Sequence, residues 1–426
     1  MDLAVRNGTV YTDDGLRNID VGIRDGTIVS LGAVSTASRE VDADGGLVLP
    51  GLVNTHTHAA MTLLRGYADD LPLHTWLEER IWPVEAELEP TDIEAGTRLA
   101  ALEMITSGTT TLADMYFGME SVADVVAESG LRARLGYGMI TAGKDEAAAR
   151  DELETGVRFV RDVDGRAGGR IHGMIAPHAP YTCDEWFLEA AAERAMELSV
   201  PLHIHLNETS SEVEEYLAET GNRPTVHLDE LGCWDGPAFV AHGVHLDEQE
   251  RSLLGERGVG VAHCPSANMK LAAGVAPVTE LEETGVRVGL GTDGPASNNT
   301  LDMFSEMRHA ALLAKVSTGD PTVSAAADVV DMATRRGAEL LGLQTGVLAT
   351  GRPADLIVVD LDAPHLTPAH DPISHAVYAA RGSDVETTIV DGEVLMEDRD
   401  VLVLDERAVR QEAATRAREL VARVDG

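Results

Sequence analysis

Residues 47–58 read LVLPGLVNTHTH, an apolar run that ends in two histidines separated by one threonine. Seven further apolar runs follow, and helical patterns rich in Ala, Glu and Leu lie between most of them. Strands that alternate with helices predict a parallel sheet, and eight such units favour an α/β fold of the (β/α)8 TIM-barrel type over a doubly wound open sheet. The seven runs are TTTLADMY (109–116), ARLGYGMI (133–140), IHGMIAPHA (171–179), PLHIHLNE (201–208), AFVAHGVHL (238–246), GVGVAHCP (258–265) and RVGLGTDG (287–294).

Both ends of the chain have a different pattern, in which short alternating strands meet at Asn-Gly, Asp-Gly and Gly-Gly turns. This pattern predicts an antiparallel β layer in the first fifty residues and more of the same style after residue 345. We therefore expect one small β-sandwich domain formed by residues 1–49 and 346–426, beside a barrel over residues 50–345. The last stretch, residues 405–426, has the periodicity of an amphipathic terminal helix.

The charge of the chain is its most unusual bulk property. Among 426 residues, 72 are acidic and 33 are Lys or Arg, so the formal net charge is −39. A field of this sign disfavours nucleic acid and anionic membrane surfaces as partners. A dispersed acidic surface with only three lysines, Lys144, Lys270 and Lys315, is typical of proteins from a salt-rich cytoplasm, where salt screens the self-repulsion.

Targeting and cysteine patterns agree with a cytoplasmic, halophilic protein. The N-terminal residues lack the basic and apolar regions of a signal peptide, and no stretch is apolar for long enough to cross a bilayer. The three cysteines form no CxxC pair and no even-numbered framework, so we expect no structural disulfide. A homo-oligomer is left open by the sequence.

Histidine or aspartate stands at the end of five of the eight apolar runs. Side chains two residues apart on a strand point to the same face, so His56 and His58 are expected to face the mouth of the barrel together. Histidine is the commonest metal ligand in proteins, and its recurrence at one end of a barrel predicts a metal-dependent active site. The residues at these ends are His56, His58, His178, His203, His205, His242, His245 and Asp293.

Longer stretches around these residues resemble a known family. The chain is similar to the amidohydrolase superfamily and, within it, to the 5′-methylthioadenosine/S-adenosylhomocysteine deaminases, over essentially its whole length. Neighbouring chlorohydrolases and guanine deaminases share parts of these motifs. The supporting stretches are GLVNTHTHAAMTLLRGYADDLPLHTWLEERIWPVE (51–85), PHAPYTC (177–183), HIHLNET (203–209), AHGVHL (241–246), HCPSANMKL (263–271) and GTDGPASNNTLDMFSEMR (291–308).

The resemblance implies a role for individual residues. It implies four metal ligands, which are His56, His58, His205 and Asp293. It also implies that Glu85 holds the ribose hydroxyls and that His178 and Glu208 contact the purine base, while Asp293 faces the substrate as well. Many relatives have an arginine near the end of the third strand, where this chain has Tyr137, so the contact with the 5′ substituent stays open.

The chemistry of the ligands favours one metal ion per chain. Binuclear relatives bridge two metals with a carboxylated lysine on the fourth strand, but none of the three lysines lies there and His178 stands at its end instead. Three nitrogens and one carboxylate leave a position for water, which is the pattern of catalytic zinc. We expect Zn²⁺, although Fe²⁺ or Mn²⁺ would accept the same ligands.

The expected activity is hydrolytic removal of ammonia from an adenine nucleoside by a C–N hydrolase. In this hypothesis Asp293 steers the attacking water, Glu208 moves protons and His242 stabilises developing charge. The sequence does not rank 5′-methylthioadenosine, S-adenosylhomocysteine, adenosine and 5′-deoxyadenosine. The alternatives are a related hydrolase acting on guanine, cytosine or a chlorotriazine, and a metal-binding barrel without catalysis.

Other polar residues near these motifs receive smaller roles. His203 is interpreted as a residue that supports the metal ligands or fills the barrel behind His205, and His74 as part of a lid loop near the substrate. Cys264 lacks the setting of a nucleophile. The base pocket is expected to include Met61, Leu63 and Trp76.

Overall fold

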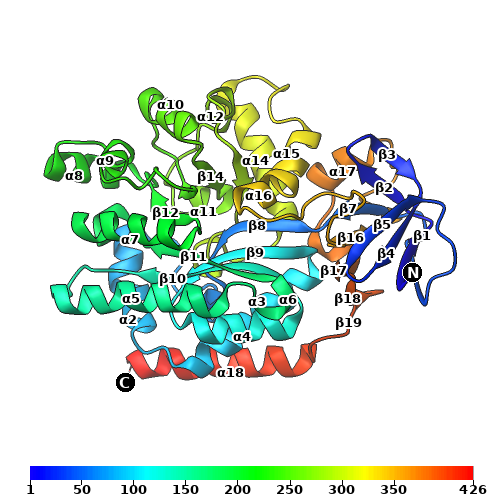
Figure 1. Ribbon diagram of the computed structural model, residues 1–426, viewed down its shortest axis with the longest axis horizontal. Coiled ribbons are helices and arrows are strands. Elements are labelled where there is room, and N and C mark those ends of the chain that lie inside the picture. The colour runs from blue at the N-terminus through cyan, green and yellow to red at the C-terminus, as the bar shows by residue number, and fades with distance from the viewer. Residues whose placement is uncertain (426) are drawn as a thin grey trace.

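The eight predicted runs form one parallel sheet in the computed structural model, which describes residues 1–425 (Figure 1). Neighbours in the sheet follow chain order from β8 to β15, so each crossover adds the next strand at the same side. This arrangement confirms the predicted barrel and not the doubly wound alternative. The strands are β8 (Leu52–Thr57), β9 (Thr109–Tyr116), β10 (Arg132–Met139), β11 (Ile171–Pro177), β12 (Leu202–Leu206), β13 (Ala238–His242), β14 (Gly260–His263) and β15 (Val288–Leu290).

Contacts between the first and the last strand close the barrel. Thr55 Oγ1 on β8 donates a hydrogen bond to the carbonyl oxygen of Leu290 at 2.9 Å. Beyond the end of β15, the backbone N–H of Asp293 donates to the carbonyl oxygen of His56 at 3.0 Å. The closure therefore places Asp293 beside the histidines at the end of β8, although Asp293 lies 236 positions after Thr57, the last residue of that strand.

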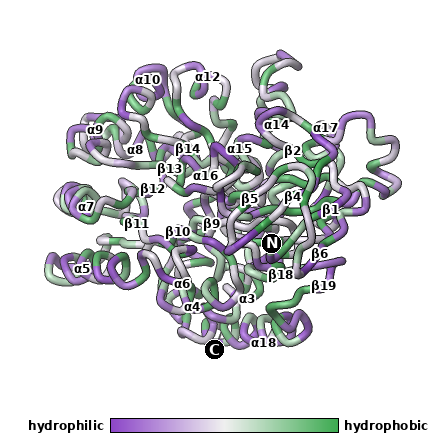
Figure 2. Tube along the Cα trace, turned by 45° about the vertical axis from the view of Figure 1, so that its right-hand side comes forward, coloured by the Kyte–Doolittle hydropathy of each residue, from purple (hydrophilic) through white to green (hydrophobic). Residues whose placement is uncertain are grey.

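Helices and single turns surround the barrel (Figure 1). Figure 2 shows the hydrophilic residues concentrated on outer helices such as α10 and α12. The helices and turns of the whole chain are η1 (Ala59–Leu64), α1 (Leu73–Trp76), η2 (Leu77–Ile81), α2 (Trp82–Glu85), α3 (Pro90–Thr106), α4 (Met119–Ser129), α5 (Glu146–Val163), α6 (Arg166–Gly169), η3 (Pro180–Thr182), α7 (Glu185–Leu198), α8 (Ser210–Thr220), α9 (Pro224–Glu230), α10 (Glu248–Arg257), α11 (Pro265–Lys270), α12 (Val278–Glu283), α13 (Pro295–Asn298), α14 (Met303–Thr318), α15 (Ala326–Met332), α16 (Arg335–Leu340), α17 (Pro372–Tyr378), η4 (Gly382–Asp384) and, within the described residues, α18 (Glu406–Asp425).

Strands from both chain ends form two further sheets beside the barrel (Figure 1). The four-stranded sheet has the order β5-β4-β1-β6, and the seven-stranded sheet has the order β19-β18-β17-β16-β7-β2-β3. Leu3, Val21, Leu356 and Ile389 lie in the one buried core between them, which confirms the predicted sandwich. The strands are β1 (Leu3–Arg6), β2 (Thr9–Thr12), β3 (Gly15–Asn18), β4 (Asp20–Arg24), β5 (Thr27–Gly32), β6 (Arg39–Asp42), β7 (Leu47–Pro50), β16 (Leu356–Val359), β17 (Val385–Val390), β18 (Glu393–Glu397) and β19 (Asp400–Val401).

The predicted antiparallel layer in the first fifty residues is wrong in two respects. The strands divide between two sheets, and two of the pairs, β1 with β6 and β2 with β7, are parallel. Each of these pairs is separated by strands that reverse the chain, so the later strand runs in the same direction as the earlier one. Turn residues in the sequence predict hairpins between neighbouring strands, but they do not predict parallel pairing between strands that are distant in the chain.

The single run predicted over residues 47–58 is two strands in two different sheets. Its first half, β7, pairs with β16 in the sandwich, and its second half, β8, begins the barrel. Gly51 lies at the change, where an added Cβ would be 2.1 Å from Thr110 Oγ1. Only glycine lets the chain pass this close to β9.

The terminal helix packs on the barrel side and not in the sandwich. α18 runs along α3 (Figure 1), and its Arg423 donates to the fully buried Asp92 carboxylate at 2.6 Å. Val409, Ala413 and Leu420 are its buried apolar positions, in agreement with the predicted amphipathic character. Among the described residues, no helix is long and apolar enough to cross a membrane.

Candidate active site

The carboxyl ends of the barrel strands carry the polar cluster. Three residues at these strand ends have left-handed backbone conformations, with φ of 50° at Asn207, 71° at His242 and 60° at Asp293. Non-glycine residues rarely adopt this conformation, and surrounding contacts must hold it. The sharp turns at these strand ends point the adjoining side chains toward the barrel axis.

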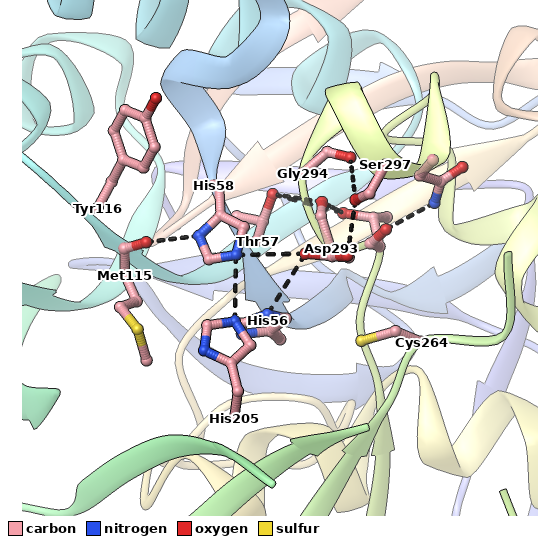
Figure 3. Close-up of polar contacts among 12 residues, drawn as sticks. His56, Thr57, His58, Met115, Tyr116, His205, Cys264, Asp293, Gly294 and Ser297 are labelled. Carbon is pink, nitrogen blue, oxygen red and sulfur yellow. Dashed lines mark hydrogen bonds and ion pairs between the residues drawn. The ribbon is translucent and has the colours of Figure 1, made fainter. Parts of the chain in front are cut away.

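His56, His58, His205 and Asp293 meet at one point (Figure 3). The Oδ1 atom of Asp293 lies 3.2 Å from Nε2 of His58 and 3.5 Å from Nε2 of His56. Nε2 of His205 lies 3.3 Å from Nε2 of His58. Four side chains from three strands, remote in sequence, therefore direct a nitrogen or an oxygen into the same small volume.

Hydrogen bonds on the far side of each ring orient these imidazoles. Nδ1 of His58 donates to the carbonyl oxygen of Met115 at 2.6 Å, and Nδ1 of His205 donates to that of His178 at 2.7 Å. A carbonyl oxygen only accepts, so Nδ1 carries the proton in both rings. Nε2 is then the nitrogen left to coordinate a cation.

His56 is oriented through a second histidine. Nδ1 of His203 lies 3.0 Å from the carbonyl oxygen of Phe239, which makes Nδ1 the donor. Burial lowers the pKa of His203 well below its usual value, so the ring is neutral and its Nε2 accepts. That Nε2 lies 2.9 Å from Nδ1 of His56, which therefore donates. Nε2 of His56 is buried, lacks a proton and has no hydrogen-bond partner among the described residues.

The electrostatics of the cluster favour a positive charge. Burial opposes the charged form of His58, but the hydrogen bond and charge of Asp293 outweigh it and raise the pKa of His58 to about 9. Burial also opposes the Asp293 carboxylate, yet the imidazoles of His56 and His58 beside it hold its pKa well below the usual value. A cation on these ligands satisfies the carboxylate in place of a proton.

Glu208 and His242 stand beside this cluster. Oε2 of Glu208 lies 3.8 Å from Nε2 of His242, and both side chains are almost completely buried. Burial raises the pKa of Glu208 above its usual value. Nδ1 of His242 contacts Oδ1 of Asn268 at 2.9 Å, which orients the ring. A carboxyl of raised pKa in a dry site has the properties of a general acid–base group.

Glu85 and His178 lie farther out on the wall. Tyr116 donates its hydroxyl hydrogen to Oε1 of Glu85 at 2.6 Å, so Oε2 stays available to a ligand. Burial raises the pKa of Glu85, with the Tyr116 hydrogen bond acting in the opposite direction. His178 is oriented by Thr182, whose Oγ1 lies 3.0 Å from its Nδ1.

A single cavity connects these groups. Its apolar walls surround a few polar groups at the base, which is the usual arrangement of a small-molecule site. His58, His205, Asp293, Glu208, His242, His178 and Glu85 line it, and His56 lies beneath them. The other lining residues are Met61, Leu73, Trp76, Leu77, Trp82, Met115, Tyr116, Phe117, Gly138, Ile140, Tyr181, Leu271 and Ser297.

Some expected contacts differ in the structure. Met61 and Trp76 line the cavity as expected, but Leu63 does not. His74 has a largely exposed side chain near Glu78 and borders an adjoining hollow instead. Tyr137 is half-buried and does not line the cavity, whereas Gly138 does. The alternation of side chains along β10 explains this last difference.

Several residues of the site were not anticipated from the sequence. Asn268 orients His242, and Ser297 donates to Oδ2 of Asp293 at 2.6 Å. Both lie in quoted motifs, HCPSANMKL and GTDGPASNN, but nothing in their spacing signals these contacts. Tyr116, the last residue of β9, and Phe117 directly after it form aromatic walls of the cavity, and their position at the end of a strand was the only sign in the sequence.

Comparison with known proteins agrees with this site. The model of the amidohydrolase family matches residues 47–395. A 5-methylthioadenosine/S-adenosylhomocysteine deaminase of Natronomonas pharaonis is 54% identical over 98% of this chain and 96% of its own. A 5′-deoxyadenosine deaminase of Methanosarcina acetivorans is 50% identical over 100% of this chain and 99% of its own. The crystal structure of an adenosine deaminase from Xanthomonas campestris with bound zinc is 36% identical, covers 100% of this chain and 98% of its own, and superposes with a TM-score of 0.93.

These similarities span almost the entire sequence. The chain therefore belongs to the amidohydrolase family and, within it, to the family of the 5-methylthioadenosine/S-adenosylhomocysteine deaminases. The predicted family and the predicted class of enzyme, a hydrolase acting on C–N bonds, are both confirmed. The family and the histidine cluster together support a divalent metal site.

Proposed function

We propose that this protein hydrolyses the exocyclic amino group of an adenine nucleoside, which releases ammonia and the inosine analogue. Candidate substrates are 5′-methylthioadenosine, S-adenosylhomocysteine, adenosine and 5′-deoxyadenosine. The observation that carries the proposal is the position of Glu208, a buried carboxyl of raised pKa, beside the convergent Nε2 atoms and Asp293. Water activation and proton transfer can therefore occur at one place.

We assign His56, His58, His205 and Asp293 as ligands of one divalent metal per chain. The unpartnered Nε2 of His56 and the orientation of the other two rings support this set. When bound there, the metal supplies Lewis acidity that lowers the pKa of water toward neutrality. Zn²⁺ is expected from the donor set of three nitrogens and one oxygen, and Fe²⁺ or Mn²⁺ would accept it too.

The protein's own side chains carry the proton transfers in this proposal. Glu208 protonates a ring nitrogen of the purine as water adds to the carbon that bears the amino group. As the C=O bond forms, the Glu208 carboxylate takes the proton of the added hydroxyl and passes it to the amino group, which leaves as ammonia; the other proton of the water, held by Asp293, then restores Glu208. Asp293 accepts a proton from the attacking water, and His242 stabilises the developing negative charge. His178 contacts the purine, and the free Oε2 of Glu85 accepts from the ribose hydroxyls.

The charge of the chain supports a place for the enzyme in a salt-rich cytoplasm. The chain has a net charge of −39 and only three lysines, so it needs high ionic strength to limit the repulsion between its own charges. Relatives from halophilic archaea are up to 54% identical to it. The same field disfavours nucleic acid and anionic membranes as partners. The division into residues 1–49, 50–345 and 346–426 stays our proposed domain assignment.

Ammonia release from a panel of substrates tests the function. The zinc-loaded enzyme in molar KCl should release ammonia from adenine nucleosides but not from guanine or cytosine, and no chloride from a chlorotriazine. Activity on guanine or a chlorotriazine alone would replace the proposal with those alternatives. A folded, metal-loaded protein that is inert toward the whole panel would be a barrel without catalysis. Glu85→Gln adds a check, because only a nucleoside requires a ribose contact.

A further inference from the structure

A second hollow lies against the wall of the central cavity beside Glu85. Four residues border both spaces: Trp82, Glu85, Phe117 and Ile140. Ala86, Ala142, Lys144 and Thr182 complete the second hollow. Apart from Glu85, Lys144 and Thr182, its lining is apolar, and we call it the side hollow.

The side hollow offers no unpaired positive charge. Lys144 is the only Lys or Arg among its lining residues, and the central cavity is lined by none. The ammonium group of Lys144 forms an ion pair with Glu152, whose other oxygen accepts from the backbone N–H of Ile140 at 3.3 Å. Glu152 is therefore held in place, and the pair contributes no net charge.

A neighbouring hollow, which shares Trp82, Ala142 and Thr182 with the side hollow, is still less favourable to an anion. It is lined by carboxylates and by neither Lys nor Arg. Its acidic residues are Glu78, Glu212, Glu215 and Glu219. An anionic group on a ligand thus meets no unpaired cation in the side hollow and several carboxylates in the hollow next to it, in a chain of net charge −39.

We propose that the side hollow binds the 5′ substituent of the nucleoside and selects neutral, apolar substituents over charged ones. This inference rests on the proposed function, because it places the ribose hydroxyls at Oε2 of Glu85. From there the 5′ end extends between Trp82, Phe117 and Ile140. A methylthio or methyl group buries apolar surface on these walls. A phosphate or an amino-acid carboxylate loses hydration there without gaining an unpaired cation.

Relative kcat/KM values across a substrate series test the selection. We expect 5′-methylthioadenosine and 5′-deoxyadenosine to exceed S-adenosylhomocysteine by at least about tenfold, and adenosine 5′-monophosphate to react slowest. Equal values for 5′-methylthioadenosine and S-adenosylhomocysteine would overturn the inference while leaving the proposed deamination intact. Absence of ammonia from every nucleoside would instead overturn the proposed function, so the two failures are distinguishable.

Substitution of Glu152 tests the cause of the selection. Glu152→Gln keeps an oxygen for the N–H of Ile140 but frees Lys144 as a cation. The ratio of kcat/KM for S-adenosylhomocysteine to that for 5′-methylthioadenosine should then rise by about three- to tenfold, the effect of one ion pair between the substrate carboxylate and Lys144 at the exposed edge of the hollow. The matched control is Glu154→Gln on the same helix, α5, which removes the same charge at an exposed position paired with Arg194.

The outcome depends on which variant changes the ratio. A rise in Glu152→Gln but not in Glu154→Gln supports a subsite governed by the Lys144 pair. An equal change in both, or none in either, would overturn the assignment of the side hollow. Addition of Lys144→Ala to Glu152→Gln should abolish the gain, because no cation then remains.

Discussion

Nδ1 of His56 lies 2.9 Å from Nε2 of His203, and this contact decides which nitrogen of His56 faces Asp293. His203 is itself fixed by the carbonyl oxygen of Phe239 and stacks on the Phe239 ring, with centroids 4.1 Å apart. The proton positions therefore propagate from a backbone carbonyl, through His203, to a proposed metal ligand. His203 was expected to support a metal ligand or to fill the barrel behind His205, and in the structure it contacts His56.

The first prediction concerns this relay. His203→Leu removes the acceptor, so His56 loses the partner that keeps its proton on Nδ1. Metal affinity should fall by about 10- to 100-fold, as for other groups that orient a ligating histidine. Competition with a chelator of known affinity measures the change. His203→Gln, which can still accept at this position, should retain more affinity than His203→Leu; equal losses would show that only the ring volume matters.

The second prediction concerns the ligands themselves. His205→Ala removes one of the four proposed donors and leaves a gap in the site, so the protein should lose most of the bound metal during purification. Elemental analysis of the purified protein should give one metal per chain in the wild type. Two metals per chain would contradict the mononuclear assignment. His245→Ala is a matched control, since His245 instead contacts the carbonyl oxygen of Ala273 at 2.7 Å.

The third prediction separates catalysis from metal binding at Glu208. Glu208→Gln should retain the metal and bind substrate, but lose about 10²- to 10⁴-fold in kcat, the range for general acid–base help. Metal content and turnover are measured on the same sample, with and without added zinc. Recovery of activity on addition of zinc would show instead that Glu208 only supports His205.

The fourth prediction concerns ionic strength. A chain of net charge −39 repels itself strongly in dilute buffer, because the Debye length is long there and charges far apart still interact. At molar salt the Debye length is only about 3 Å, so this repulsion is largely screened. Circular dichroism should therefore show loss of structure in dilute buffer and its recovery at molar KCl. The same melting temperature in both solutions would contradict the halophilic character.

The fifth prediction follows from the buried Glu306. Burial raises its pKa to about 7, although its oxygens accept from Ser266 N at 3.2 Å and from Asn298 Nδ2 at 2.8 Å. The unfolded chain releases this proton near pH 4.5 and the folded chain near 7, so stability falls as the pH rises through that window. By linkage, this one group costs up to about 3 kcal/mol above pH 7.

Glu306→Gln removes that dependence. The difference in unfolding free energy between the variant and the wild type should shift in favour of the variant from pH 5 to pH 8, at constant molar salt. Glu248→Gln, at an exposed position of α10, serves as the control and should show no such shift. A constant offset for Glu306→Gln at both pH values would contradict the raised pKa.

The sequence by itself determined the barrel, because the periodicity of apolar residues and the positions of turn residues are local properties of the chain. Eight apolar runs with polar ends specify strands and crossovers, and a parallel barrel brings all their carboxyl ends to one mouth. The histidines and Asp293 at these ends could therefore be expected to meet at the mouth, whereas the choice of His56, His58, His205 and Asp293 among them came from the family resemblance. The same logic failed for the directions of β1 with β6 and of β2 with β7, because pairing between distant strands leaves no local sign.

Only the tertiary structure decided the protonation and the walls of the site. Whether His203 is a ligand or orients one depends on a rotation toward His56, and whether Tyr137 or Gly138 faces the cavity depends on the register of β10. The neutral state of the side hollow depends on a helix residue, Glu152, reaching Lys144. These outcomes depend on contacts of a few ångströms between side chains from different elements, and hydrogen bonds and ion pairs are decided at that scale, where residue spacing carries no information.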